Sequence, residues 1–139
     1  MRRVVVTGLG LVTPLGCGVE ATWNNLTASK SGVKPITHID VSDIPARIAG
    51  QVPRGEQPHP FVADSYIEPK EQKKMDTFIH FAMGAATQAV EDAGIAALSD
   101  EEKLRAGVMI GSGIGGLNAI EETVLMMKEK GPRRVSPFF

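Results

Sequence analysis

The stretch GVMIGSGIGGLNAI, residues 107–120, decides the predicted fold. Residues 107–110 end in successive apolar side chains, which is typical of a short strand buried on both faces. The glycine-rich turn GSGIGG follows at residues 111–116, and apolar residues at helical spacing then predict a helix up to Gly131. A strand that passes through a tight turn into a helix indicates an α/β protein with a mainly parallel sheet.

The amino-terminal half predicts the same alternation of strand and helix. Residues 3–7 (RVVVT) form a second β-branched run that predicts a buried strand, and residues 19–28 predict a short helix. Residues 34–68 contain five prolines, so we expect a surface loop there, with one strand at residues 47–52.

The longest predicted helix begins at Pro69 and ends at a capping glycine, Gly94. Apolar residues recur between these bounds at intervals of three and four, which gives one apolar stripe for packing against a sheet. Residues 99–102 (SDEE) predict the start of a short helical turn, because a serine cap followed by acids favours a helix start.

The length of 139 residues fits one domain, and 42% hydrophobic with 22% charged residues is typical of a globular chain. A net charge of -1 argues against bulk attraction to nucleic acid or to an anionic membrane. No apolar stretch reaches the about 20 residues of a membrane-spanning helix. The single cysteine, Cys17, excludes an intrachain disulfide and indicates a reducing, cytoplasmic compartment.

The amino terminus leaves one alternative open. Its basic start and Cys17 after Gly16 resemble a lipoprotein signal, although glycine, threonine and Pro14 interrupt the apolar run.

The residues of the glycine motif at 111–116 leave two interpretations open, a dinucleotide-binding turn and a purely structural one. G-x-G-x-x-G between a strand and a helix occurs in dinucleotide-binding sites, but these require an acid about 20 residues further, and residues 133–137 contain none. The glycines could instead only allow close backbone packing. Ser112 is not a hydrolase elbow, because isoleucines stand where that motif has its glycines.

The remaining reactive side chains indicate no site of their own. His38, His59 and His80 lie far apart and lack the spacing of metal ligands, so no metal site is predicted. Cys17 has no neighbouring histidine or basic residue to activate its thiol as a nucleophile.

Two basic clusters allow two interpretations. They comprise Lys70, Lys73, Lys74, Arg133 and Arg134. The lysines are predicted on one side of the longest helix, away from its apolar stripe. They form either a solvated face or a surface that receives an acidic partner.

Four stretches together resemble the β-ketoacyl-acyl-carrier-protein synthases of fatty acid synthesis, most closely the second, elongating type. They are RVVVTGLG (residues 3–10), KEQKKMD (70–76), GSGIGG (111–116) and GPRRVSPFF (131–139). They occur in the family's order and span nearly the whole chain. The loop at residues 34–68 matches least, and nothing is carried over to it.

The resemblance implies a thiolase fold, in which two similar α/β halves stack in five layers, and a homodimer. Residues 1–139 would be an amino-terminal part of the first half. In the family, a cysteine takes an acyl group from acyl carrier protein. Two histidines then help malonyl-carrier-protein lose carbon dioxide, and the resulting carbanion attacks the acyl-enzyme. The fold supplies a thiolate at a helix start and donors for the oxyanion.

The same resemblance implies that the nucleophilic cysteine comes after Phe139, so no catalytic residue is expected in this chain. We predict that residues 1–139 do not condense acyl groups alone, and that no cofactor is needed. The aromatic pair Phe138 and Phe139 at the terminus indicates a cut chain rather than a finished domain. A stand-alone module that binds carrier protein is the rival interpretation.

Non-catalytic roles are carried over residue by residue. Ile114 resembles a residue beside the acyl-chain pocket, and Phe139 resembles a pocket or gating residue. The five basic residues of the two clusters resemble the surface that receives acyl carrier protein. The preferred acyl-chain length is not implied.

Overall fold

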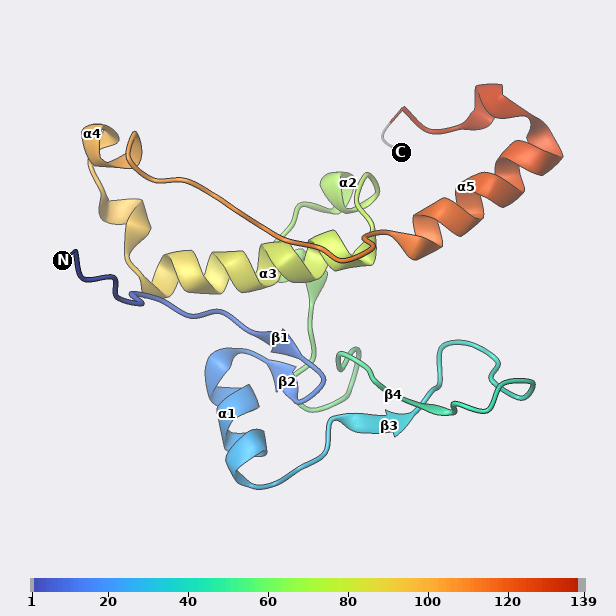
Figure 1. Ribbon diagram of the computed structural model, residues 1–139, viewed down its shortest axis with the longest axis horizontal. Helices are drawn as coiled ribbons and strands as arrows, with labels where there is room; N and C mark the ends of the chain where they lie inside the picture. The colour runs from blue at the N-terminus through green and yellow to red at the C-terminus, as the bar shows by residue number, and fades with distance from the viewer. Residues whose placement is uncertain (1, 138–139) are drawn as a thin grey trace.

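The computed structural model describes residues 2–137 and is built around one long helix (Figure 1). The strands are β1 (Val12–Thr13), β2 (Gly16–Cys17), β3 (Val33–Pro35) and β4 (Ile48–Gly50). The α-helices are α1 (Val19–Thr27), α2 (Pro69–Gln72), α3 (Thr77–Asp92), α4 (Asp100–Lys103) and α5 (Leu117–Lys130). The 3₁₀ turns are η1 (Ala63–Ser65), η2 (Ile95–Ala97) and η3 (Pro132–Arg134). The amino-terminal segment runs along α3, and the segment from α4 to α5 approaches α3 only near the start of that helix (Figure 1).

The strands of residues 2–137 form two small antiparallel sheets. β1 pairs with β2, placing Val12 opposite Cys17, and β3 pairs with β4, placing Val33 opposite Gly50. β4 confirms the strand expected at residues 47–52.

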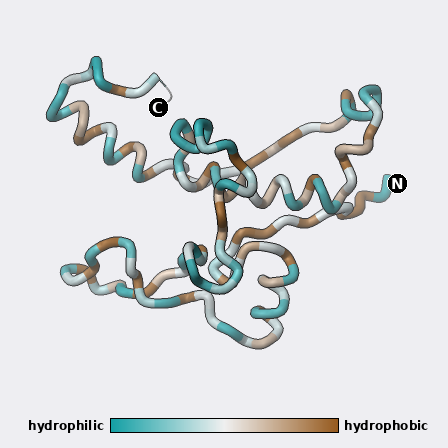
Figure 2. Tube along the Cα trace, turned by 180° about the vertical axis from the view of Figure 1, so that it is seen from behind, coloured by the Kyte–Doolittle hydropathy of each residue, from teal (hydrophilic) through white to brown (hydrophobic). Residues whose placement is uncertain are grey.

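The predicted strands at residues 3–7 and 107–110 have no strand partner within residues 2–137. Their side chains are exposed, Val4 to 92% and Met109 to 99%, and Figure 2 shows the apolar colour along the amino-terminal segment. A strand exists only through hydrogen bonds to a neighbouring strand, so apolar sequence alone does not form a sheet. The mainly parallel sheet is therefore unconfirmed and stays a prediction.

The helix predicted from Pro69 onwards is two helices, because Asp76 interrupts it. Asp76 has extended backbone, with φ −76° and ψ 162°, and its side chain accepts a hydrogen bond from the Thr77 N–H. A side chain in this position satisfies one of the N–H groups that a helix start leaves without a partner. At the other end, Gly94 adopts a left-handed φ of 65° just after α3, which confirms the predicted capping glycine.

Two glycines bring the amino-terminal segment directly against the backbone of α3. A Cβ at Gly8 would lie 2.6 Å from the backbone nitrogen of Ala93, and one at Gly10 would lie 2.8 Å from that of Ala89. Real Cβ atoms essentially never come this close to other atoms. Gly8 and Gly10 therefore allow close packing of the amino-terminal backbone against α3.

Side chains of α3 hold the same segment through its backbone. The Leu9 N–H donates to Oδ2 of Asp92 at 2.9 Å, and the Leu11 N–H donates to Oε1 of Gln88 at 3.1 Å. These bonds satisfy donors that a sheet neighbour would satisfy in a strand.

The buried side chains fall in two places, with Ala21 and Thr22 in α1 and Phe61 and Ile67 on either side of η1. Phe61 is 7% exposed and Ile67 is 5% exposed. The Phe61 ring stacks on Tyr66 with centroids 5.6 Å apart and meets the edge of Phe81 at 5.1 Å. A Cβ on Gly84 would lie 2.6 Å from the Phe61 ring, so this glycine of α3 makes room for the aromatic cluster.

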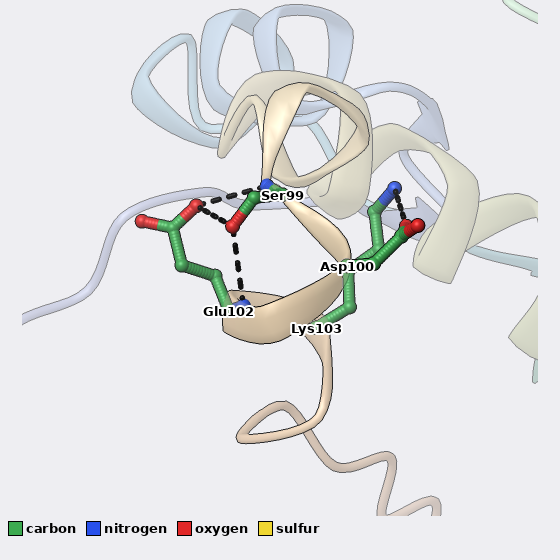
Figure 3. Close-up of polar contacts among 4 residues, drawn as sticks. All are labelled: Ser99, Asp100, Glu102 and Lys103. Carbon is green, nitrogen blue, oxygen red and sulfur yellow. Dashed lines mark hydrogen bonds and ion pairs between the residues drawn. The ribbon is translucent and has the colours of Figure 1, made fainter.

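α4 begins with the capping box that the sequence predicts (Figure 3). The Ser99 N–H donates to Oε2 of Glu102 at 2.9 Å, and the Glu102 N–H donates to Oγ of Ser99 at 3.3 Å. Hydrogen bonds from the Ser99 backbone and side chain lower the pKa of Glu102. Lys103 forms an ion pair with Asp100 at 3.7 Å, one turn apart on the same helix.

We expect Gly10→Ala to destabilise the protein by about 1–3 kcal/mol, because the added methyl group has to push the backbone away from α3. Thermal or urea unfolding would measure this. Gly107→Ala is the matched control, since a Cβ there meets nothing within 4 Å. Equal stability of the two variants would contradict the packing.

Candidate functional site

A cavity of about 560 Å³ lies between the start of α3 and α5. Its lining combines basic, apolar and small residues, among them Lys73, Lys74, Phe78, Gly116, Ile120 and Ser136. The cavity therefore brings together parts of three stretches that the sequence analysis singled out separately, at residues 70–76, 111–116 and 131–139.

Asp76 joins α3 to α5 at one edge of this cavity. One of its carboxylate oxygens accepts the Thr77 N–H, and Oδ2 accepts the Ala119 N–H at 3.1 Å. A Cβ on Gly116 would lie 3.1 Å from Cγ of Asp76 and would overlap Oδ2. The last glycine of the motif therefore allows the carboxylate to reach α5.

The glycines of the motif differ in their surroundings. Gly115 has a left-handed φ of 82°, and a Cβ there would touch the Phe78 ring at 3.5 Å. A Cβ on Gly111 or Gly113 would meet nothing within 4 Å. The turn is thus held at its carboxyl end. The side chain of Ile114, which is predicted to lie beside an acyl pocket, is 74% exposed to solvent.

The predicted docking lysines do not lie on the longest helix, contrary to expectation. Lys70 lies in α2, Lys73 caps its carboxyl end, and Lys74 follows in the turn before α3. The reason is that regular helix stops at Gln72 and resumes only at Thr77, after the extended Asp76. All three are exposed, and Lys74 forms an ion pair with Glu71 at 2.6 Å.

The two predicted arginines, Arg133 and Arg134, are exposed in η3 at the end of α5. Neither arginine lines the cavity. Ser136, which follows Arg134 by two residues, lines it together with Lys73 and Lys74. The structure therefore brings the cavity-side lysines close to the segment that follows the arginines. Phe139, the other predicted pocket residue, lies outside the described residues.

The histidines are not gathered at one place. His38 shares a hydrogen bond with Gln51 at 2.7 Å, and Nε2 of His80 lies 3.1 Å from the Gln72 carbonyl oxygen. Within residues 2–137, no group of three or more histidine, cysteine or acidic side chains is arranged to hold a metal ion.

Sequence reasoning missed a polar cluster around Cys17. Nε2 of Gln88 donates to the Tyr66 hydroxyl at 3.2 Å and to Sγ of Cys17 at 3.5 Å, and the thiol and hydroxyl lie 3.5 Å apart. The hydrogen bond with Cys17, followed by burial, raises the pKa of Tyr66, and the bond from Gln88 opposes this. The members come from three distant segments, so no local motif could have revealed the cluster.

The family described as "Beta-ketoacyl synthase, N-terminal domain" matches residues 1–139. The chain belongs to this family. Among curated relatives, it is 49% identical to 3-oxoacyl-[acyl-carrier-protein] synthase 2 of Rhizobium meliloti, over 100% of this chain and 33% of that protein. The enzyme of the same name from Vibrio cholerae is 46% identical, over 99% of this chain and 32% of that protein. The chain thus spans about a third of the length of these relatives.

A solved structure titled "The ishigamide ketosynthase/chain length factor" is similar, with a TM-score of 0.74 and 29% sequence identity. The match covers 99% of this chain and 32% of that one. Membership of the β-ketoacyl synthase family confirms the resemblance, and the structural match supports the thiolase-like fold. Among the helices of residues 2–137, none has the length and apolar character needed to cross a bilayer.

We expect Gly115→Ala to destabilise the protein by about 1 kcal/mol, because an L-residue with a Cβ pays a steric cost in the left-handed region. Denaturant unfolding would measure the loss. Gly111→Ala is the control, since its added methyl group has open space and needs no left-handed backbone. A variant as stable as the control would show that the turn adopts another conformation.

Proposed function

We propose that this chain is the amino-terminal part of an elongating β-ketoacyl-acyl-carrier-protein synthase of fatty acid biosynthesis. The complete enzyme would condense malonyl-acyl-carrier-protein, with loss of carbon dioxide, with an acyl group held on the enzyme. The product would be β-ketoacyl-acyl-carrier-protein. The observation that carries this proposal is the 49% identity to a 3-oxoacyl-[acyl-carrier-protein] synthase 2 over 100% of the chain.

Residues 1–139 would contribute binding surfaces rather than catalytic groups. We propose that the apolar runs at residues 3–7 and 107–110 become strands of a mainly parallel sheet when the rest of a synthase is present. Their exposure and apolar character support this, because such runs suit strands covered on both faces. A homodimer in the cytoplasm, working without a cofactor, completes the proposal.

The proposed surface for acyl carrier protein, here called the docking surface, consists of Lys70, Lys73, Lys74, Arg133 and Arg134. All five are exposed, and one of them, Lys74, is paired with Glu71 at 2.6 Å. Complementary charge speeds encounter and sets orientation more than it adds final affinity. The resemblance of these five residues to the surface that receives acyl carrier protein in the family is what favours docking over a merely solvated face.

The proposed acyl-chain surface consists of Ile114 and Phe139. Ile114 is an apolar side chain that is 74% exposed at the tip of the glycine turn. Covering an exposed apolar side chain with another apolar group removes both from water and lowers the free energy. A fatty chain would provide such a cover.

A chimera tests the proposed reaction. Residues 1–139 would replace the corresponding third of the Rhizobium meliloti relative, and malonyl-dependent formation of β-ketoacyl-carrier-protein would be followed. We expect the chimera to condense, and residues 1–139 alone to show no condensation. A well-folded chimera without activity would overturn the assignment, and activity of the 139 residues alone would refute the missing catalytic groups.

The docking surface is tested by replacing Lys70, Lys73 and Lys74 with glutamate in the chimera. We expect the association rate with acyl carrier protein to fall by about tenfold at low salt, because the reversed charges repel an acidic partner. Surface plasmon resonance at several salt concentrations would measure this.

The matched control reverses three exposed lysines elsewhere, Lys30, Lys34 and Lys103. It changes the net charge equally, so it separates a local surface from overall charge. Equal association rates for the two triple variants would count against the docking surface.

A further inference from the structure

We propose that Asp76 is a positioning residue that holds the glycine turn, and with it Ile114, in place for the acyl chain. This inference rests on the proposed function, because it assigns Asp76 a role in acyl selection.

α5 begins without a cap of its own. Gly116 occupies the N-cap position with φ −87° and ψ 72°, and it has no side chain that could accept a hydrogen bond. The first N–H groups of any helix lack intrahelical partners. Ala119, the third residue of α5, donates its N–H to Oδ2 of Asp76 at 3.1 Å. This is the donor that an N-cap side chain normally satisfies.

One carboxylate therefore caps two helices. Asp76 accepts the Thr77 N–H at the start of α3 and the Ala119 N–H at the start of α5. Both helix starts carry partial positive charge from their aligned peptide dipoles, which favours a negative side chain between them. A neutral or shorter side chain would lose one of these interactions.

Gly116 leaves the space that the Asp76 carboxylate occupies. A Cβ at that position would overlap Oδ2 of Asp76 and lie 3.1 Å from its Cγ. A carboxylate held by two helix starts cannot move away freely, so a side chain here would displace either Asp76 or α5. The link therefore depends on both residues together.

The turn is anchored close to Ile114. Gly115 faces Phe78 and Gly116 faces Asp76, so the first turn of α3 supports the two residues that follow Ile114. The earlier glycines, Gly111 and Gly113, have open space where a side chain would be. Losing the Asp76 link would leave Ile114 less defined, which would weaken selection among acyl chains rather than the chemical step.

Asp76→Ser separates the two caps in the chimera. Serine is a good N-cap, so it still serves α3, but its single short oxygen cannot also reach Ala119. Steady-state kinetics with acyl-carrier-protein substrates of short and long chains would be measured. We expect KM for long chains to rise about fivefold relative to short chains, with kcat for the short chain retained. Asp76→Ala should give the same change in KM and a lower Tm.

Two results would overturn the inference. One is an Asp76→Ser variant that retains activity and in which KM depends on acyl-chain length as it does in the unsubstituted chimera. The other is a parallel loss of kcat for every chain length, which would indicate general damage to the fold. If the unsubstituted chimera does not condense, the proposed function fails instead.

A double-mutant cycle between Gly116→Ala and Asp76→Ser tests the contact itself. We expect Gly116→Ala to lower Tm strongly with Asp76 present and much less in the Asp76→Ser background, because the clash is with the carboxylate. Gly113→Ala is the control and should have no effect in either background. Additive changes in Tm would show that the two residues act independently, and the inference would fall.

Discussion

Close approach of other segments to α3 is the constraint on which this structure depends. Gly8 and Gly10 bring the amino-terminal backbone against the helix, and Gly84 makes room for Phe61 on another part of it. Gly116 does the same at the helix start, where Asp76 reaches α5. At each of these places an added Cβ would meet atoms that have little freedom to move, so glycine is required there by space.

Hydrogen bonds from side chains on and next to α3 complement these close approaches. Asp92 and Gln88 accept N–H groups of the amino-terminal segment, and Asp76 accepts those of two helix starts. Such bonds satisfy backbone donors that have no strand or helix partner, which makes the path of the chain specific. α3 therefore organises both the amino-terminal segment and the segment that carries the glycine turn.

The candidate site combines two surfaces with different physics. The proposed docking surface is exposed and basic, and the effect of its charges would extend over about the screening length in salt, which would suit a first encounter with a large partner. The glycine turn, in the proposed role, would act at contact distance, where apolar cover and shape decide binding. The cavity at the start of α3 is lined by Lys73 and Lys74 of the first surface and by Gly116 of the glycine turn, so the two proposed surfaces adjoin there.

The sequence by itself determined the features that depend on neighbours along the chain. The caps at Gly94 and Ser99, the amphipathic helix before Gly131 and the spacing of the family's four stretches could all be read locally. These features follow from backbone conformation and side-chain periodicity within a few residues. The break at Asp76 was missed because the apolar stripe continues across it.

Only the tertiary structure decided which distant residues meet. The link from Asp76 to Ala119 spans 43 positions, and that from Cys17 to Gln88 spans 71. The same holds for the runs at residues 3–7 and 107–110, whose apolar pattern predicted strands that find no partner within residues 2–137. Periodicity tells which side chains avoid water, but hydrogen bonds between distant groups depend on the path of the whole chain.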